Sequence, residues 1–266
     1  MALITLTTDF GTADPWVGIM KGVIAERAPG VPVIDVTHGI PPQDVLAGAL
    51  VLRHAVPYFP RGAVHVAVVD PGVGTSRRAL CVVTDRALLV GPDNGLLSLA
   101  AGGARRIVEL TDERFFLSPR SATFHGRDIF APVAAALAAG TAPLAFGPEV
   151  PDMQHLELPP LVYEAAGVRG EVVWVDRFGN LTTNITEEAL AAFPRSHLSI
   201  SIAGARLRGI AVSYGAAPRG QAVAVVNSWG LLEIAVRDGS ASAVLGARVG
   251  DPVTVGAPER ATSRSS

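Results

Sequence analysis

Apolar positions in the first part of the chain recur with two different periods, which predict strands and helices in turn. Short β-branched runs at Leu3–Thr8, Val31–Thr37 and Val64–Val69 are typical of buried strands. Between them, apolar residues recur at helical spacing after Asp14-Pro15, where Asp14 suits an N-cap, and again over Asp44–Val56. This order of strand, helix, strand, helix and strand builds a parallel sheet with right-handed crossovers.

The next stretch continues the pattern with shorter elements. Leu80–Thr84 and Ala87–Val90 predict a pair of strands, and Ile107–Leu110 predicts another strand. An alanine-rich run over Ile129–Ala139 predicts a helix. Prolines then crowd the segment from Gly147 to Pro160, which leaves little room for regular structure and indicates a connection between domains.

Beyond this connection the chain is rich in β-branched residues, with one short predicted helix at Glu187–Phe193. The predicted strands are Glu171–Val175, Leu198–Ile202, Ala222–Val226, Leu231–Val236 and Pro252–Val255. We therefore predict an α/β fold with an N-terminal α/β domain over residues 1–158, whose central sheet is mostly parallel. A linker at 159–168, a smaller antiparallel β-barrel-like domain at 169–258 and a disordered tail at 259–266 follow.

Composition and charge exclude several classes of protein. The 266 residues are 49% hydrophobic and carry a net charge of −2, with scattered arginines, so we expect no nucleic-acid partner. The apolar window from Ala131 to Phe146 is broken by prolines and is too short to span a bilayer, so we expect no membrane partner. The N-terminus has no signal-peptide pattern, and the one cysteine, Cys81, has no partner for an internal disulfide. These features predict a reduced, cytoplasmic location.

Candidate chemistry begins at the end of the Val64–Val69 run. Asp70 follows it directly, glycines in the next residues permit a tight turn, and Arg77 comes shortly afterwards. Ligands of open α/β sheets bind beyond the carboxyl ends of the strands, and the predicted strands before Asp9 and His38 should end at the same edge. Asp70 and Arg77 are therefore site candidates. The alternative is that Asp70 caps its turn and Arg77 is a solvated charge.

Other candidate residues lie in turns. His125 precedes the predicted helix at 129–139, where unpaired N–H groups favour ligands, although it can equally be a hydrogen-bonded loop histidine. In the second half, the segments Asp176–Asn180 (DRFGN) and Asn227–Gly230 (NSWG) combine aromatic, amide and acidic or hydroxyl groups. Such groups can stack on and read a planar base, or they can simply form β-turns.

Seven motifs follow one another along the chain, namely TTDFG, HGIPPQD, VVDPGVGTSRR, GPDNGLL, TFHGRD, DRFGN and NSWGLLEIAVRDGSA. Taken together and in this order, they resemble the S-adenosylmethionine (SAM) hydroxide adenosyltransferase family, which is similar to fluorinating and chlorinating enzymes. The resemblance implies cleavage of SAM by water to adenosine and methionine. It also implies an α/β domain followed by a β-barrel domain, and a homotrimer whose sites lie between one subunit's N-terminal domain and its neighbour's C-terminal domain.

The resemblance also assigns residues. It makes Asp70, Arg77 and His125 the catalytic group that binds and orients the attacking water. It implies that Asp9 binds the ribose and that Asp14, Asp176 and Ser228 bind the amino-acid end of the substrate. Phe178 and Asn180 are implied to bind the adenine. Trp229 and the backbone near Arg237 and Asp238 are implied to complete the substrate site. SAM is then substrate, with no cofactor and no metal. Gln43 and Trp229 depart from the fluorinating enzymes, which carry tryptophan and arginine there.

Three other functions compete with this hypothesis. Asp9, Asp70, Asp93 and Asp128 could hold Mg²⁺ for a phosphohydrolase, although arginines close in sequence to Asp70 and Asp128 count against it. A non-catalytic protein that binds SAM or adenosine would need the turns of the second half but not Asp70, Arg77 and His125. A SAM-dependent halogenase is possible on fold, but the acidic Asp70 disfavours it because the halogenating relatives carry an uncharged residue there.

Overall fold

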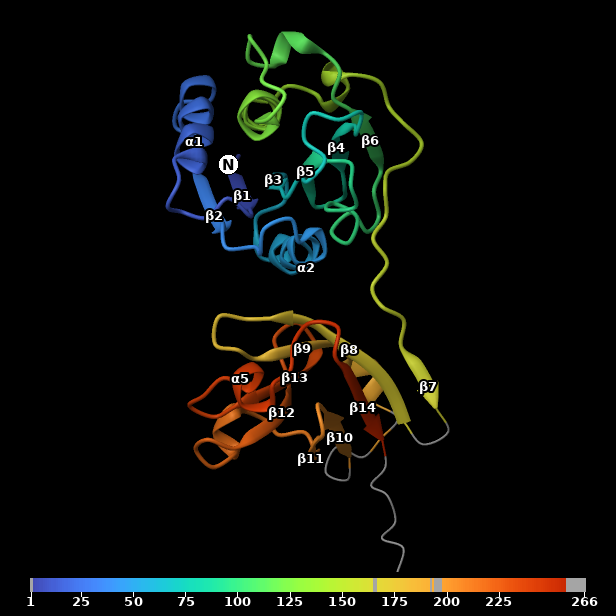
Figure 1. The fold of residues 1–266 in the computed structure, drawn as a ribbon. Coiled ribbons are helices and arrows are strands. Elements are labelled where there is room, and N and C mark those ends of the chain that lie inside the picture. The colour runs from blue at the N-terminus through green and yellow to red at the C-terminus, as the bar shows by residue number, and fades with distance from the viewer. Residues whose placement is uncertain (1, 165–166, 192, 194–197, 257–266) are drawn as a thin grey trace, which may run out of the picture. The chain divides into compact units, whose positions relative to one another are not determined.

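The computed structural model describes residues 2–164, 167–191, 193 and 198–256, and the chain divides into two compact units between Leu156 and Glu157 (Figure 1). Each unit has its own sheet and its own hydrophobic core. The predicted tail at 259–266 lies outside the described residues. No helix within these described ranges is both long and apolar enough to cross a membrane.

The first unit is built on a six-stranded, mostly parallel sheet with the strand order β2-β1-β3-β5-β4-β6. Its strands are β1 (Ile4–Thr8), β2 (Val33–Thr37), β3 (Ala63–Val68), β4 (Ala79–Val83), β5 (Ala87–Pro92) and β6 (Arg106–Glu109). Strand β1 pairs in parallel with β2 and β3, and β3 pairs in parallel with β5, whereas β4 runs antiparallel to β5 and β6. This arrangement confirms the predicted fold class of this half.

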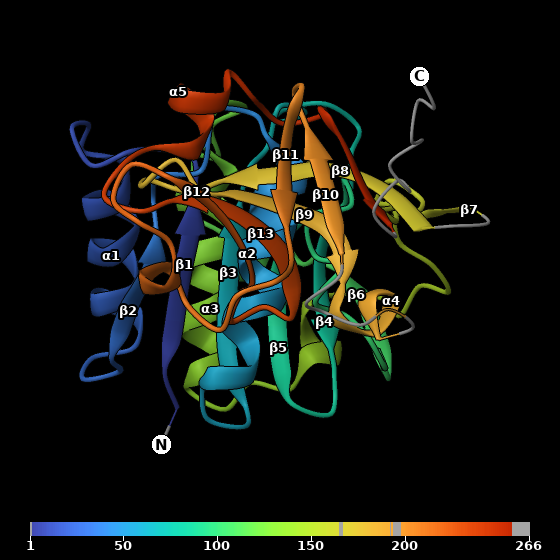
Figure 2. The same cartoon turned by 90° about the horizontal axis from the view of Figure 1, so that it is seen from below.

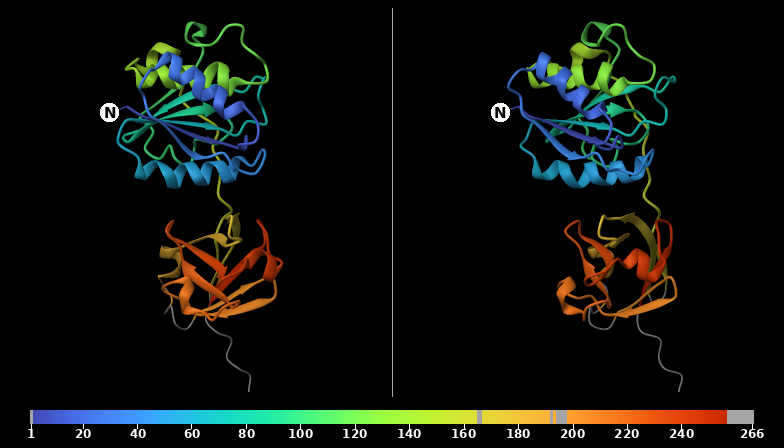
Figure 3. Two further views of the ribbon diagram at one scale, coloured as in Figure 1. Left: turned by 90° about the vertical axis from the view of Figure 1, so that its left-hand side faces the viewer. Right: turned by 60° about the vertical axis from the view of Figure 1, so that its left-hand side comes forward.

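Helices cover both faces of this sheet, with α1 and α3 on one face and α2 on the other (Figure 3). The helical segments are α1 (Trp16–Arg27), α2 (Val45–Ala55), a π-helical turn (Gly126–Phe130) and α3 (Ala131–Ala138), with 3-10 turns at Val56–Tyr58, Glu113–Phe115 and Pro143–Phe146. Leu6, Val66, Met20 and Phe130 are fully buried in the core between the sheet, α1 and α3. Burial of each such side chain contributes about 1.5–3 kcal/mol to the free energy of unfolding.

One expectation for a helix start in this unit is wrong, and a second helix start has a feature that the sequence did not indicate. Pro15, not Asp14, is the N-cap of α1, no side chain caps that helix, and Asp14 is exposed. The alanine-rich helix, expected from Ile129, is preceded by a π-helical turn that begins directly after His125. By contrast, Asp44 does cap α2, because its carboxylate accepts a hydrogen bond from Ala47 N at 2.9 Å.

The second unit is an antiparallel sheet with the order β11-β10-β14-β8-β9-β13-β12, and β7 pairs beside β8 (Figure 2). Its strands are β7 (Val162–Glu164), β8 (Gly167–Val175), β9 (Leu181–Thr186), β10 (Ser199–Ile202), β11 (Ala205–Arg208), β12 (Ala222–Val226), β13 (Leu231–Val236) and β14 (Pro252–Gly256). Short helices are α4 (Glu187–Leu190), a 3-10 turn (Tyr214–Ala216) and α5 (Ala241–Leu245). Ala211 N donates to Ala224 O at 2.8 Å, which brings the two ends of the ladder together. The sheet is therefore nearly a closed barrel, as predicted.

The segment 159–168 is more regular than a linker. Strand β7 lies within it and pairs antiparallel with β8, whose first residues also fall in this range. The prolines that suggested an irregular connection stop at Pro160, just before this pairing begins. The irregular part of the connection therefore ends earlier than the sequence indicates.

Candidate active site

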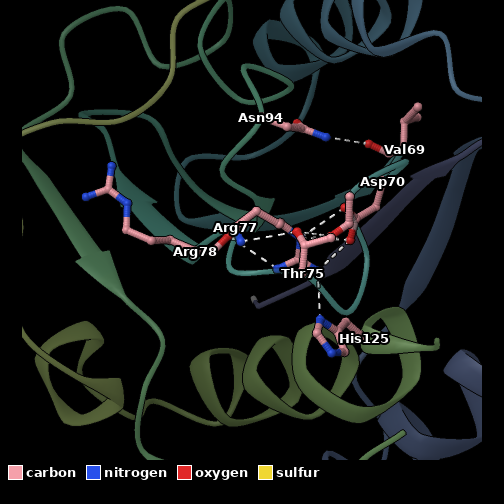
Figure 4. Close-up of polar contacts among 8 residues, drawn as sticks. Val69, Asp70, Thr75, Arg77, Arg78, Asn94 and His125 are labelled. Carbon is pink, nitrogen blue, oxygen red and sulfur yellow. Dashed lines mark hydrogen bonds and ion pairs between the residues drawn. The ribbon is translucent and has the colours of Figure 1, made fainter. Parts of the chain in front are cut away.

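Asp70 lies at the carboxyl end of β3, and the residues before and after it are held by hydrogen bonds. Asn94 Nδ2 donates to the carbonyl of Val69 at 2.9 Å, while Asn94 Oδ1 accepts from Leu96 N at 3.1 Å (Figure 4). Thr75 Oγ1 donates to Gly72 O at 2.7 Å and so closes the turn that follows. The turn directs the chain back toward the sheet, and Arg77 lies two residues before the start of β4.

Gly74 lets this turn approach the loop that carries His125. Its φ is +78°, and a Cβ at this position would lie 2.3 Å from the carbonyl oxygen of Ala122. A side chain would therefore meet both an unfavourable backbone conformation and a clash with another backbone. The glycine is needed because two segments distant in sequence meet here.

Arg77 binds Asp70 in a bidentate manner. Its Nε lies 2.9 Å from Asp70 Oδ1, and its Nη2 lies 2.5 Å from Oδ2. Both side chains are largely buried, with 9% of Arg77 and 5% of Asp70 exposed. The guanidinium carbon also lies 5.4 Å from the centre of the Phe130 ring. This geometry contradicts the alternative in which Arg77 is a solvated surface charge.

His125 contacts the same guanidinium from the start of the π-helical turn. Its Nδ1 lies 2.7 Å from Arg77 Nη2, so Asp70 and His125 converge on one arginine (Figure 4). A guanidinium only donates, so Nδ1 accepts, and a neutral imidazole then carries its proton on Nε2. Burial, and then the positive charge of Arg77, lower the pKa of His125 below its ordinary value. The imidazole is therefore neutral near pH 7.

A cavity of about 390 Å³ opens beside this group. Asp70 and His125 line it together with Asp9, and Arg77 lies behind them. The remaining walls are largely apolar and aromatic and include Phe10, Trp16, Gln43, Val73 and Phe124. This size is within the range of about 300–1,000 Å³ that is usual for small-molecule sites, and a few polar groups in an apolar wall are typical of them.

Asp9 has one fixed partner, since its Oδ2 accepts a hydrogen bond from Gln43 N at 2.8 Å. Gln43 has a positive φ of 67°, an uncommon conformation for this residue, and it lines the cavity beside Asp9. Asp14 is exposed and is not among the lining residues. Of the candidates in the first unit, the structure thus brings Asp9, Asp70, Arg77 and His125 together and leaves Asp14 outside the cavity.

In the second unit, Asp176 organises its own turn. Its Oδ1 accepts from Phe178 N at 2.9 Å and from Asn180 N at 2.8 Å, and its Oδ2 accepts from Asn180 Nδ2 at 3.0 Å. These contacts support the β-turn interpretation of DRFGN. They also leave Phe178 projecting, with 75% of it exposed, which is unusual for a large aromatic residue.

The NSWG segment is likewise a turn. Asn227 Oδ1 accepts from Trp229 N at 2.9 Å and from Leu231 N at 3.2 Å, and Ser228 is exposed. The guanidinium of Arg237 is engaged with the carbonyls of Gly215 and Ala217, at 3.1 and 2.8 Å from Nη1. The next residue, Asp238, has a φ of +57°, so the backbone here is held in a sharp bend.

Of the four acids considered for magnesium, Asp9 and Asp70 line the cavity, whereas Asp93 and Asp128 are not among its lining residues and are bound to arginines. Asp93 accepts from Arg78 Nε at 2.7 Å and from Gln154 N at 2.7 Å, and Asp128 is buried against Arg127. Within the described part of the chain, no three His, Cys, Asp or Glu side chains come together in a way that could hold a metal ion. This arrangement disfavours the phosphohydrolase hypothesis.

Sequence reasoning did not single out several residues that shape this site. Asn94 and Phe124 lie within the quoted motifs GPDNGLL and TFHGRD but were given no role, so motif membership was the available signal. Trp16 and Phe130 carried no signal, because aromatic residues at helical spacing are ordinarily core residues. Their contacts with Phe124 and Arg77 appear only in three dimensions.

Comparison with known proteins identifies the family. Residues 4–147 match the SAM hydroxide adenosyltransferase N-terminal domain, and residues 170–254 match the C-terminal domain. A protein of Salinispora tropica named (R)-S-adenosyl-L-methionine hydrolase is 48% identical over 95% of this chain and 97% of its own. A fluorinase of an Actinoplanes species is 26% identical over 69% of this chain and 71% of its own.

A solved structure agrees with these matches. The crystal structure of an uncharacterized conserved protein from Thermotoga maritima has a TM-score of 0.90 and 36% identity, and it covers 95% of this chain and 99% of that one. Both halves of the sequence and the overall fold thus match along nearly their whole length. The chain belongs to the SAM hydroxide adenosyltransferase family.

Proposed function

We propose that this protein hydrolyses S-adenosyl-L-methionine to adenosine and L-methionine by attack of water on C5′ of the ribose. The observation that carries the proposal is the contact of Asp70 and His125 with one buried guanidinium at the wall of a cavity of about 390 Å³. Family membership supports the substrate, because the hydrolase named above shares nearly half of its residues with this chain. That relative's name specifies the (R) configuration at sulfur, and we extend this preference to the present chain.

The reaction needs an aligned nucleophile more than it needs an acid. The new bond forms between the water oxygen and C5′, and the C5′–S bond breaks with its electron pair going to sulfur. The sulfonium becomes a neutral thioether on departure, so its leaving does not require protonation. Fixing the water in line with the breaking bond removes much of the entropic barrier, with effective molarities of up to ~10⁵ M or more.

The geometry favours Asp70 as the acceptor of the water's proton. His125 Nδ1 is occupied by Arg77, and its Nε2 carries a proton in the neutral state, so His125 presents a donor and not a base. Asp70 Oδ2 accepts from both Nε and Nη2 of Arg77, whereas Oδ1 accepts from Nε and keeps a second acceptor position for the water. His125 and Asp70 can therefore hold one water between a donor and an acceptor, and Asp70 receives the proton as the C5′–O bond forms.

The same charge gives selectivity for water over halide. Asp70 lines the cavity, and a carboxylate there repels an anion while it attracts the hydrogens of a water molecule. An enzyme that uses halide as its nucleophile must avoid this repulsion, and the halogenating relatives carry an uncharged residue at the position of Asp70. We therefore assign water as the nucleophile and treat a halogenase as the alternative that the experiment must exclude.

Binding of the substrate follows the family resemblance. Asp9 holds the ribose hydroxyls, and its position in the cavity wall supports this role. Phe178 stacks on adenine and Asn180 binds it, with the backbone near Arg237 and Asp238 at the edge of the base. Asp14, Asp176, Ser228 and Trp229 surround the amino-acid end. The Asp176 carboxylate already accepts three hydrogen bonds within its turn, and it binds the substrate through the acceptor capacity that these bonds leave unused.

Assembly and location are also proposals. We propose a homotrimer in which each site combines the N-terminal domain of one subunit with the C-terminal domain of its neighbour, as the family resemblance implies. We propose a reduced, cytoplasmic setting, which the buried free thiol of Cys81 supports. The substrate SAM and the product adenosine are then the small-molecule partners, with no cofactor.

The direct test is to incubate the purified protein with (R)-SAM, separately with its (S) epimer, and with (R)-SAM plus chloride or a chelator. We expect adenosine and methionine in equal amounts from the (R) epimer, with little effect of chelation. A 5′-chloronucleoside as main product would support a halogenase, and loss of activity with chelator would support a metal-dependent enzyme. Binding of SAM without any turnover would support the non-catalytic alternative.

A further inference from the structure

A buried histidine that the proposed mechanism does not use lies at the same edge of the sheet. His38 follows β2 and is 6% exposed. Along β1 and β2, Leu6 pairs with Asp35 but Thr7 pairs with Thr37, so the register shifts by one residue at Val36. The shifted register brings the His38 ring beside Thr8, and His38 Nδ1 lies 2.8 Å from Thr8 Oγ1.

These two residues fix the backbone on both sides of Asp9. Thr8 Oγ1 accepts a hydrogen bond from Phe10 N at 3.2 Å, and the carbonyl of His38 accepts one from Gly11 N at 2.8 Å. Asp9 and Phe10 both line the cavity, whereas Thr8 is fully buried behind them. The turn that presents the Asp9 carboxylate is thus held at Phe10 by Thr8 and at Gly11 by His38. Neither Thr8 nor His38 lines the cavity.

The histidine is supported in turn from the helix side. His38 Nε2 lies 3.1 Å from Asp35 Oδ1, and Asp35 Oδ2 accepts a hydrogen bond from Lys21 of α1 at 2.6 Å. The Nε2 contact with Asp35 is an ion-pair distance without hydrogen-bond geometry, whereas Nδ1 is hydrogen-bonded to the Thr8 hydroxyl. A chain of polar contacts therefore runs from α1 through the end of β2 to the last residue of β1.

We propose that Thr8 and His38 are positioning residues that aim the Asp9 carboxylate at the ribose hydroxyls of the substrate. The inference rests on the proposed function, because it takes the ligand of Asp9 to be a ribose. It predicts that the Thr8–His38 contact contributes to recognition of the 2′- and 3′-hydroxyls in addition to any contribution to stability. Without the contact the turn can shift, and a hydrogen bond from Asp9 to a hydroxyl is sensitive to small displacements.

The chain contains a matched pair for the control. Thr5 of the same strand binds His65 of β3 through the same atoms, Oγ1 and Nδ1, at the same distance of 2.8 Å, and both residues are fully buried. Thr5 and His65 face each other across the parallel pairing of β1 and β3, away from the carboxyl ends of these strands. Neither residue lines the cavity. Loss of this pair removes the same type of bond without releasing Asp9.

The experiment compares Thr8→Val, Thr8→Ser and Thr5→Val with the wild-type protein. Hydrolysis of SAM is inhibited with adenosine and with 2′,3′-dideoxyadenosine, and the ratio of the two inhibition constants reports recognition of the hydroxyls. We expect the preference for adenosine to fall about fivefold in T8V, to be restored in T8S and to be unchanged in T5V. The KM for SAM should rise in T8V more than kcat falls. Thermal unfolding of all variants measures stability separately.

The outcomes separate this inference from the proposed function. If the wild-type protein does not release adenosine from SAM, the proposed function fails and this inference fails with it. If the wild type hydrolyses SAM and prefers adenosine but T8V keeps the full preference, only the positioning role is wrong. An equal loss of preference in T5V and T8V would also overturn it. Should T8V not fold, His38→Asn provides the same comparison, since its shorter amide cannot reproduce both contacts of the imidazole.

Discussion

At the scale of single residues, the site depends on one guanidinium with two different partners. Arg77 donates three hydrogen bonds to the Asp70 carboxylate and a fourth to His125, while its guanidinium also packs against the Phe130 ring. Bidentate recognition of this kind requires the planar fork of arginine, which lysine lacks. Asp70 and His125 are thereby fixed at the cavity wall with opposite roles toward a water molecule, the first as acceptor and the second as donor.

Replacement of Asp70 tests its two proposed effects together. In Asp70→Ala we expect hydrolysis of SAM to slow by about 100-fold or more, because the acceptor of the proton is lost. Chloride should at the same time become a better nucleophile, since its repulsion by the carboxylate is gone. Both products can be measured by chromatography with and without chloride. Asp70→Asn, which keeps the shape of the side chain, serves as the control for lost packing. Unchanged hydrolysis in D70A would remove Asp70 from the mechanism.

The pH dependence of activity tests the state of His125. Because burial and Arg77 lower its pKa, the ring stays neutral to a lower pH than an ordinary histidine, whose pKa is about 6.5. Protonation then blocks Nδ1 and breaks the contact with Arg77. We expect kcat/KM to be flat around neutrality and to fall only below pH 6.5. In His125→Asn, whose amide oxygen can accept from Arg77, this acid limb should be reduced. A limb centred above pH 6.5 would contradict the assignment.

The sequence could predict part of this site from physical reasoning alone. Asp70 and Arg77 lie close together around a glycine-rich turn at a strand end, so their proximity was expected. His125 is distant in sequence, and its role came from the family resemblance. Membership of a motif marked Asn94, but its contact with Val69 O and the contact of Phe130 with the guanidinium could not be predicted. Nothing in a single sequence indicates such contacts.

At the scale of elements, the turn after β3 and the loop before α3 must meet closely. Gly74 makes this possible, since any Cβ there would overlap the carbonyl oxygen of Ala122. Gly72, two residues earlier in the same turn, has no such restriction, as a Cβ there would make ordinary contacts of 3.5 Å with Arg77 and Thr75. The two glycines therefore differ in their structural importance although the sequence shows them in equivalent settings.

Alanine substitutions at these two positions should behave differently. Gly74→Ala should lower the free energy of unfolding by ~2 kcal/mol or more, through the strained φ and the clash, and should separate the Arg77 turn from His125. Activity should fall with it. Gly72→Ala should keep nearly all stability and most activity. Urea denaturation and initial rates measure both effects. Similar stability of the two variants would show that the turn does not pack against the loop as described.

The predicted elements were largely confirmed, and strand β9 and the π-helical turn were missed for different physical reasons. Strand β9 contains Thr182, Thr183 and Asn184, which are buried but polar, so a search for apolar runs passes over them. Their side chains are satisfied by Glu233, by the carbonyl of Leu232 and by the backbone of Glu171. The π-helical turn after His125 was also missed, because apolar periodicity does not distinguish it from an ordinary helix start.

At the scale of the whole molecule, the division into two units matches the division of labour in the proposed function. The water-binding group and the cavity belong entirely to the first unit. The turns proposed to bind adenine and the amino-acid end belong to the second unit. Length and composition predicted this organisation, whereas the sequence could not indicate how subunits assemble, because that depends on surfaces and not on periodicity.

The proposed homotrimer can be tested in solution. Sedimentation velocity over a range of protein concentrations should give one species with three times the mass of the 27.5 kDa chain. Activity per subunit should fall on dilution if the trimer dissociates, because each site would then lack its second half. A monomer that is stable and fully active would contradict both the assembly and the shared site.

The central claim is that water, held by Asp70 and His125, attacks C5′ of SAM. The most direct measurement is to run the reaction in H₂¹⁸O and locate the label in the products by mass spectrometry. We predict one ¹⁸O atom in the 5′-hydroxyl of adenosine and none in methionine. Adenosine without the label, or label found only in the amino-acid product, would contradict the account.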